Sequence, residues 1–234
     1  MIQVSDVSKS FHGFQALDQV QMHVPKGSIY GLVGPNGAGK TTLIRHLTGI
    51  YKPDSGSIRI DGEPIWENPN MKARISYIPD DPFCFLQADT LEMKRFYSGI
   101  YPNFDKEMFT RMQEFFPSID LKRNVRRLSR GMQKQVAFWI ALCCRPDVLI
   151  LDEPVDGLDP VMRRQVWNII LSMVTERHTT VMVSSHNLRE LEDICDHVGI
   201  MHHGKIMLER SLCDLQSNIS KIQVAFQEGM PNLP

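Results

Sequence analysis

The sequence lacks an apolar run of the roughly 18 residues that a membrane-spanning helix needs. It also lacks a net charge, since 26 Lys and Arg residues stand against 27 Asp and Glu residues, a formal balance of −1. A near-neutral chain has no global positive field to attract a polyanion, so we expect no nucleic-acid partner. What it has is 234 residues, 42% of them hydrophobic, which is enough for a folded core.

Paired cysteines are missing as well. The five cysteines are odd in number and include no C-x-x-C pair, and two of them, Cys143 and Cys144, lie in an apolar stretch. This usage is typical of reduced thiols rather than of disulfides or a zinc site. We therefore expect a cytoplasmic protein.

Hydrophobic patterns predict an α/β fold. The predicted strands cover residues 2–11, 16–24, 28–34, 55–62, 75–79, 147–151, 179–185 and 198–208. The predicted helices cover residues 40–50, 160–176 and 188–197, beside a mostly helical block at about 88–145. Strands alternate with helices in the second half, which indicates a parallel sheet. The helical block interrupts this core, and the tail holds one alternating segment, residues 222–226.

A glycine-rich motif, GPNGAGKT, fills residues 34–41 between a predicted strand and a predicted helix. Glycines let the backbone bend around a phosphate, so that successive N–H groups point at the anion from a helix N-terminus. Lys40 adds a full positive charge, and the Thr41 hydroxyl suits Mg²⁺. The predicted phosphate-binding residues are Gly34, Pro35, Asn36, Gly37, Ala38, Gly39, Lys40, Thr41 and Thr42.

Two carboxylates, Asp152 and Glu153, end the apolar strand VLIL. Ligands of open α/β sheets bind at the carboxyl ends of the strands, so these acids are expected beside the bound phosphates. Asp152 is expected to hold Mg²⁺, and Glu153 to orient or deprotonate an attacking water.

Three further motifs make the chain resemble the ATP-binding subunits of ABC transporters over about residues 1–212. The segment Leu128 to Met132, LSRGM, is similar to the LSGGQ signature of that family. The triplet GLD at residues 157–159 is similar to its D-loop, and His186 in VSSHNLRE is similar to its switch histidine. Within the family, the chain looks most like the ABC-2 exporter and YtrB-like subgroup.

The resemblance implies a P-loop NTPase fold: a RecA-like parallel sheet, an N-terminal antiparallel β subdomain and an inserted helical subdomain. It implies one ATPase domain over residues 1–220, with a short tail at 221–234. The expected activity is Mg²⁺-dependent ATP hydrolysis that powers transport, in the export direction, through a separate permease subunit. The protein is then peripheral on the inner face of the cell membrane, in a homodimer or a heterodimer with a paralogous cassette.

The same resemblance implies a role for single residues. Phe11 stacks on the adenine, Glu153 and His186 are catalytic, and a second chain supplies contacts to each ATP. The residues expected to act on the ATP of the other chain are Ser129, Arg130, Gly131, Met132 and Asp159.

Three positions depart from the family pattern. Asp80 stands where the family has a glutamine after the strand that ends at Pro79, and an aspartate there remains a possible Mg²⁺ ligand. Arg130 replaces the first signature glycine, and Met132 replaces the signature glutamine.

Other interpretations of the function stay open. The runner-up is a soluble ABC ATPase that acts on ribosomes or DNA, although such relatives usually carry two cassettes or a coiled-coil insertion. A P-loop kinase or GTPase gives the signature and His186 no role, and a regulatory subunit with a degenerate site fits poorly with an intact Lys40 and Glu153. The sequence does not identify the transported substrate.

Overall fold

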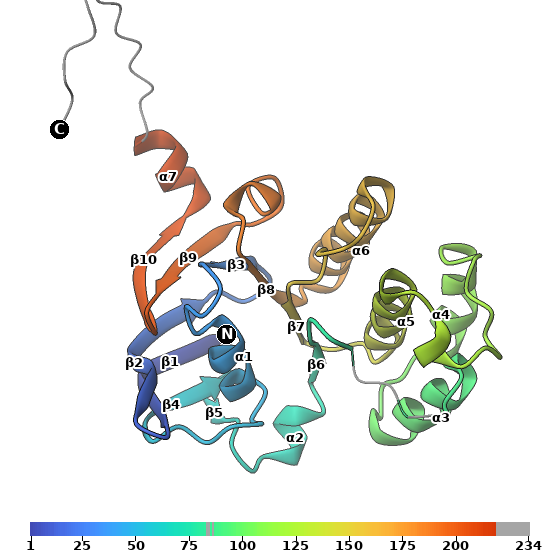
Figure 1. Cartoon of the computed structure of the whole chain (residues 1–234), viewed down its shortest axis with the longest axis horizontal. Coiled ribbons are helices and arrows are strands. Elements are labelled where there is room, and N and C mark those ends of the chain that lie inside the picture. The colour runs from blue at the N-terminus through green and yellow to red at the C-terminus, as the bar shows by residue number, and fades with distance from the viewer. Residues whose placement is uncertain (83–84, 86, 219–234) are drawn as a thin grey trace, which may run out of the picture.

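The protein is described from a computed structural model, which covers residues 1–82, 85 and 87–218. Two β-sheets share the chain with a group of helices, and Figure 1 shows the helices α3, α4 and α5 at the far end of the molecule from β1 and β2. Among the described residues, no helix combines the length and the apolar character needed to cross a membrane. The predicted α/β P-loop NTPase architecture is confirmed.

The first sheet has four antiparallel strands in the order β2-β1-β4-β5. They are β1 (Ile2–Phe11), β2 (Phe14–Val24), β4 (Ser55–Ile60) and β5 (Glu63–Pro64). Alternate residues of β1 and β2, including Ile2, Val4 and Val20, are buried, as expected for strands with one covered face. A tight hairpin joins β1 to β2 and pairs Phe11 with Phe14.

The second sheet has six strands in the order β10-β9-β3-β8-β7-β6. They are β3 (Ile29–Val33), β6 (Ile75–Ile78), β7 (Val148–Asp152), β8 (Thr180–Ser185), β9 (His197–His202) and β10 (Lys205–Ser211). All of them are parallel except β10, which pairs antiparallel with β9. The carboxyl ends of β3, β6, β7 and β8 therefore meet at one edge of the sheet.

One predicted strand, residues 198–208, is wrong. The chain reverses at His203 and Gly204, both with positive φ (44° and 75°), and forms the β9–β10 hairpin. Two residues of this backbone type make the turn that best matches the twist of paired strands. The glycine at 204 is required, because a Cβ there would lie 2.8 Å from the carbonyl oxygen of Ala16.

The helices lie on both sides of the six-stranded sheet. They are α1 (Lys40–Leu47), α2 (Pro69–Lys72), α3 (Thr90–Ile100), α4 (Lys106–Arg111), α5 (Arg130–Cys143), α6 (Pro160–Arg177) and α7 (Leu212–Asn218), with 3₁₀ turns at Met112–Glu114, Val125–Arg127 and Leu188–Glu190. The elements from α3 to α5 fill the predicted helical block between β6 and β7. The domain boundaries stay a prediction, and residues 222–226 lie outside the described residues.

The predicted helix at 188–197 is also wrong. It is a 3₁₀ turn, Leu188–Glu190, followed by further turns. Its end is pulled into the sheet, because the Asp196 N–H donates to the Ile29 carbonyl (2.9 Å) while its carboxylate accepts from the Ile29 N–H (2.8 Å).

Each central strand buries both faces. In β7, Val148 and Ile150 pack with α1 and the antiparallel sheet, whereas Leu149 and Leu151 pack with the core around α5 and α6. Successive side chains of a strand point to opposite faces, so one short strand serves two cores.

The described cysteines, Cys143, Cys144, Cys195 and Cys213, are free.

Candidate functional site

The phosphate-binding loop, Gly34 to Thr42, runs from the end of β3 into the first turn of α1. Gly37 and Gly39 have positive φ (79° and 108°), and Gly39 caps α1 without any side-chain hydrogen bond. A Cβ at Gly34 would lie 2.3 Å from the Met201 carbonyl oxygen. The loop thus needs its glycines, and it leaves the first N–H groups of α1 without a side-chain cap, as an anion site requires.

Lys40 opens α1 and is 6% exposed. Its Nζ donates to the Gly34 carbonyl at 2.7 Å and lies 3.2 Å from Oε1 of Glu153. The lysine therefore bridges the phosphate-binding loop and the acid that follows β7. A bound phosphate would offer this cation the same kind of contact that it now makes with Glu153.

Asp152 is the last residue of β7 and is 1% exposed. The Ser184 hydroxyl donates to its Oδ1 at 2.6 Å and accepts from the Glu153 N–H at 3.0 Å. The neighbouring strand β8 thus orients both acids. Ser184 has no sequence motif of its own, and only the β7–β8 register, which pairs it with Asp152, shows its role.

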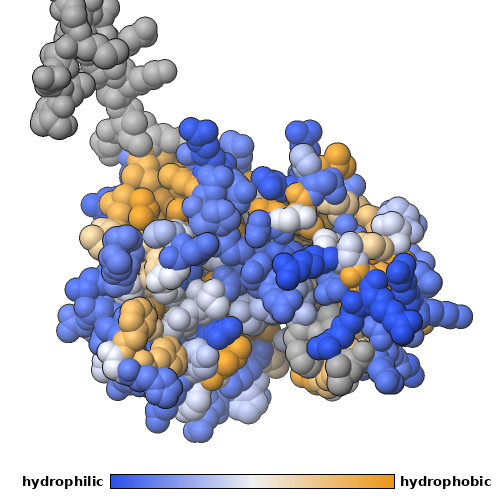
Figure 2. All heavy atoms as spheres, in the orientation of Figure 1, coloured by the Kyte–Doolittle hydropathy of each residue, from blue (hydrophilic) through white to orange (hydrophobic). Residues whose placement is uncertain are grey.

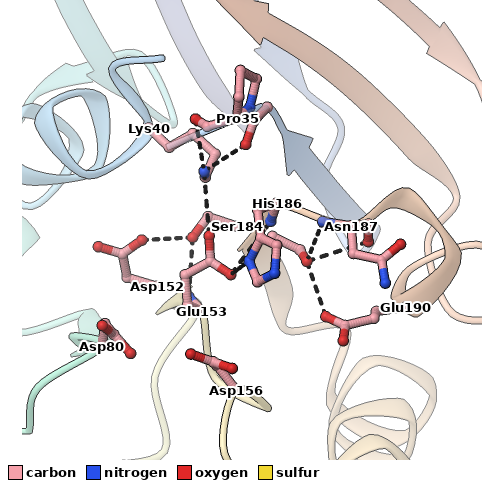
Figure 3. A network of polar contacts seen from close by, with 12 residues as sticks. Pro35, Lys40, Asp80, Asp152, Glu153, Asp156, Ser184, His186, Asn187 and Glu190 are labelled. Carbon is pink, nitrogen blue, oxygen red and sulfur yellow. Dashed lines mark hydrogen bonds and ion pairs between the residues drawn. The ribbon is translucent and has the colours of Figure 1, made fainter. Parts of the chain in front are cut away.

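Glu153 follows with a φ of 48°, a backbone conformation that is uncommon for a residue with a side chain. Its Oε2 accepts from the His186 backbone N–H at 3.3 Å and lies 3.0 Å from Nδ1 of His186. Figure 3 shows the carboxylate between Lys40 and His186. The structure brings these three predicted residues together, from β7, α1 and the end of β8.

The turn after β8 is itself anchored. The Ser185 hydroxyl donates to Glu190 at 3.0 Å and accepts from the Asn187 N–H at 3.0 Å, while Glu190 pairs with Arg163 of α6 at 3.3 Å. The side chain of His186 stays 47% exposed. The ring is therefore accessible at a fixed backbone position.

The signature segment, Leu128 to Met132, begins α5. The Ser129 hydroxyl caps the helix by accepting from the Met132 N–H at 3.3 Å. Gly131 has no positive φ, and the nearest atom to a Cβ placed there is 3.6 Å away. Among the described residues, Arg130 has no ion-pair partner. Figure 1 shows α5 beside α3 and α4, away from the first turn of α1.

Asp159 and the GLD triplet lie just after the β7 carboxylates. Asp159 caps α6, because its Oδ1 accepts from the N–H groups of Val161 and Met162, each at 3.0 Å. Gly157 has a φ of 74°, and a Cβ added there would have no described atom within 4 Å. This turn is therefore open to the outside.

Asp80 follows β6 and is 58% exposed, and its Oδ1 lies 3.0 Å from Nζ of Lys134. Lys134, on α5, is a site residue that sequence reasoning missed. Figure 3 shows Asp80 on the opposite side of Glu153 from Lys40. Burial raises the pKa of the nearby Tyr77 to about 12, and the charges of Asp152 and Asp80 add to this shift, so both carboxylates act on one hydroxyl.

Phe11 ends β1 and its ring meets Tyr51 edge to face, with ring centres 5.4 Å apart. The Lys9 ammonium lies over the Phe11 ring, 5.5 Å from its centre. An aromatic pair of this kind is a suitable wall for a nucleobase. Tyr51 has no motif in the sequence and was also missed.

A magnesium ion needs oxygen ligands, and Thr41 and Asp152 supply them beside the phosphate-binding loop. Among the described residues, no group of three or more His, Cys, Asp and Glu side chains forms an all-protein metal cage. Mg²⁺ usually keeps several waters and binds through one or two protein oxygens together with substrate phosphates. The buried Asp152 carboxylate and the Thr41 hydroxyl therefore fit Mg²⁺ that arrives with a nucleotide.

Known proteins resemble this chain over nearly its full length. A family model described as ABC transporter matches residues 17–156. The chain is 34% identical over 229 residues to the ABC transporter ATP-binding protein YtrB of Bacillus subtilis (strain 168), covering 97% of this chain and 77% of that protein. It is 36% identical over 211 residues to the bacitracin transport ATP-binding protein BcrA of Bacillus licheniformis, covering 89% and 69%.

A solved structure of an ATP-binding subunit of an ABC transporter matches with a TM-score of 0.84 at 27% identity, over 93% of this chain and 92% of that one.

Proposed function

The chain belongs to the ABC transporter family, as one of its ATP-binding subunits, and we propose that it hydrolyses Mg²⁺-bound ATP to drive export through a separate permease. The observation that carries the proposal is the Lys40–Glu153–His186 arrangement beside a glycine-rich anion loop. It joins a cation for phosphate, an acid for water and an imidazole at one edge of the sheet.

The residues have distinct tasks in this reaction. The N–H groups of Gly37 to Thr42 and the ammonium of Lys40 bind the β- and γ-phosphates of ATP. Glu153 orients the attacking water in line with the γ-phosphate, and His186 contacts the γ-phosphate oxygens. Phosphoryl transfer asks a protein mainly for positioning and for stabilisation of charge, which these groups provide.

ATP must first separate Lys40 from Glu153. Their 3.2 Å ion pair occupies both groups, and a phosphate that recruits Lys40 frees the carboxylate for water. Thr41 and Asp152 are the proposed ligands of Mg²⁺, which would neutralise charge on the phosphates. Asp80, predicted as a third ligand, is paired with Lys134 at 3.0 Å and would act on the ion through its charge. Glu153 is therefore paired with Lys40 before ATP binds and becomes available to the attacking water only afterwards.

A second cassette completes each site. Ser129, Arg130, Gly131, Met132 and Asp159 are proposed to contact the ATP of the other chain, which is either a second copy or a paralogue. Two features of the described chain support this arrangement: Arg130 at the N-terminus of α5 has no ion partner there, and the turn at Gly157 is open. Hydrolysis removes the phosphate between the two chains, so the pair opens, as in other ligand-controlled two-state switches.

The permease is proposed to bind a groove between the sheet and the helical region. This groove has a volume of about 380 Å³ and a mostly apolar lining that includes Ile50, Tyr77, Tyr97 and Ile140. The proposed contact segment is residues 80–86, of which residues 83, 84 and 86 lie outside the described residues. Phe85 packs on Phe96 of α3, with ring centres 4.7 Å apart. An apolar groove on an ATPase subunit suits an amphipathic segment of a partner.

Export is the proposed direction, and the cytoplasmic face of the membrane is the proposed location. The similarity to a protein named for bacitracin transport supports a substrate that crosses the membrane, without identifying it.

The alternative is an ABC ATPase that acts on ribosomes or DNA. Its most suitable surface is the basic segment of residues 121–130, LKRNVRRLSR, in the helical region where Figure 2 shows strongly hydrophilic side chains. Co-purification with a polytopic membrane protein rather than with ribosomes decides between the two.

The test of the proposal is Glu153→Gln. The variant should keep ATP binding and lose turnover by at least about 100-fold, because an amide cannot accept the proton of the attacking water. It should also accumulate an ATP-bound dimer in gel filtration with Mg²⁺.

The control is Glu176→Gln, an exposed acid on α6, which should hydrolyse ATP like the wild type. Wild-type protein without Mg²⁺-dependent hydrolysis would reject the enzymatic proposal. A Glu153→Gln protein that stays monomeric with ATP would reject the two-chain site for identical copies.

A further inference from the structure

A buried lysine, Lys134, lies behind the acids of the site. It projects from α5 and is 6% exposed. Its Nζ donates to Asp80 Oδ1 at 3.0 Å, to the Glu153 carbonyl at 2.9 Å and to the Asp156 carbonyl at 3.0 Å. An ammonium group has three N–H donors, so all of them are used.

These three acceptors belong to segments that lie between the regular elements. Asp80 follows β6, Glu153 follows β7, and Asp156 lies in the turn before α6. Glu153 in addition holds its uncommon φ of 48°. A single side chain from the helix of the signature segment thus fixes the backbone at Glu153 and ties it to Asp80.

We propose that Lys134 is a positioning residue of the ATPase site: it holds the Glu153–Asp156 turn in place and neutralises Asp80, which limits the negative charge beside the bound metal. The inference rests on the proposed ATPase function. It names a residue and a charge pair, Lys134–Asp80, that the phosphate-binding and carboxylate motifs do not contain.

The charge argument starts from the acids that share the site. The Lys134 ammonium contacts both Asp80 Oδ1 (3.0 Å) and the carbonyl of Glu153 (2.9 Å), the residue after Asp152, so Asp80 lies near the carboxylate proposed to hold Mg²⁺. Glu153 has Lys40 as its ion partner, and the only ion partner of Asp80 in the described part of the chain is Lys134. Loss of Lys134 leaves an uncompensated carboxylate, which strengthens the attraction of the site for a divalent cation.

A cavity adjoins the Lys134–Asp80 pair. It has a volume of about 230 Å³, and Asp80, Arg130, Lys134, Asp156 and Gly157 line it. The same hollow therefore touches the acid after β6, the signature segment and the turn before α6.

The experiment is a double-mutant cycle with Lys134→Met, Asp80→Asn and the combination of both. The first measurement is the Mg²⁺ concentration at which a fluorescent ATP analogue is half bound. Lys134→Met should lower this concentration severalfold, because Asp80 is left charged. Asp80→Asn should raise it, because Lys134 is left charged, and the double variant should return close to the wild type.

The second measurement is steady-state hydrolysis at saturating Mg²⁺. Lys134→Met should lower kcat by about 10- to 100-fold with little change in the KM for ATP, as expected when a catalytic group is slightly misplaced. Asp80→Asn should not restore this loss, because the carbonyl contacts to Glu153 and Asp156 remain missing. Lys134→Gln keeps two N–H donors and should lose less kcat than Lys134→Met.

Lys122→Met, which removes an exposed lysine from the segment before α5, is the matched control and should change neither measurement. Thermal unfolding of all variants identifies a protein that has not folded, in which case Lys134→Gln and Asp80→Asn carry the test.

The inference would be overturned if the Mg²⁺ concentration at half binding is unchanged in the Lys134 and Asp80 variants. It would also be overturned if both single variants shift this concentration in the same direction and the double variant shows the sum of the two shifts. A wild type that neither binds nor hydrolyses ATP would instead reject the proposed function. In that case the thermal-unfolding cycle still reports whether Lys134 and Asp80 interact.

Discussion

Two helix N-termini of this chain, those of α1 and α5, are proposed to face phosphate, and their surroundings differ. At α1 the glycines are enforced by the protein itself: a Cβ at Gly39 would lie 2.8 Å from the Met201 side chain and 2.9 Å from the Ala16 carbonyl oxygen. At α5 a Cβ at Gly131 meets nothing closer than 3.6 Å among the described residues. Contacts among the described residues therefore do not require a glycine at position 131.

The charged residues differ in the same way. Lys40 is buried and held by a carbonyl and by Glu153, whereas Arg130 is exposed and has no ion partner in the part of the chain that the structure describes. The proposed phosphate-binding half of the site is therefore assembled within one chain, whereas the signature segment lies at the surface. This difference supports the proposal that a second cassette contacts the signature segment.

Lys40→Ala should break the complete half and have the largest effect on binding. The variant loses the only side-chain cation of the phosphate-binding loop, so we expect ATP affinity to fall by at least about 100-fold, as for the loss of a strong charge-assisted contact. Isothermal titration calorimetry with Mg²⁺ and ATP measures the change. Lys26→Ala, an exposed lysine at the opposite end of β3 from the loop, should bind like the wild type. Unchanged binding in Lys40→Ala would reject the loop as the phosphate site.

The sequence was sufficient for this half of the site. Residues 34–42 form a local motif between a strand and a helix, and Asp152 and Glu153 end an apolar strand. Both predictions therefore depend only on residues that are adjacent in the sequence. His186 needed the ordered series of motifs, and the structure places its ring against Glu153.

Residues without a local pattern could not be predicted. Lys134 is a single charged residue in a helix, and its three hydrogen-bond acceptors lie 19 to 54 residues away in the chain. Ser184 and Tyr51 depend on strand register and on packing in the same way. The β9–β10 turn did have a signal, since two histidines before Gly204 and Lys205 are typical of a turn at the end of a strand, although residues 198–208 were assigned to one strand.

Ser129→Arg should break the incomplete half, with a smaller effect on binding than Lys40→Ala has. A bulky cation at the mouth of the signature segment blocks the approach of a second chain, so turnover should fall while each chain still binds ATP. If identical copies share the site, a mixture of Ser129→Arg and Lys40→Ala should recover hydrolysis that neither variant has alone, because one of the two sites then combines an intact loop with an intact signature segment. A steady-state ATPase assay of the mixture measures this.

The matched control is Arg126→Ala, which removes an exposed charge near the signature segment without adding bulk and should leave the recovery unchanged. A Ser129→Arg protein with normal turnover would show that the signature segment does not act on ATP.

Phe11→Ala should have the smallest effect, because it removes contact with the base and leaves the phosphate contacts intact. Stacking of a base on an aromatic side chain contributes about 1–3 kcal/mol, so ATP affinity should fall by roughly 5- to 150-fold. The loss should lie near the lower limit, since Tyr51 stays in place beside the vacated position. Phe14→Ala, across the same hairpin and 67% exposed, is the control and should bind ATP normally. Because stacking discriminates little between bases, GTP affinity should fall with ATP affinity in Phe11→Ala, and a loss confined to ATP would show that Phe11 reads the edge of the adenine rather than its face.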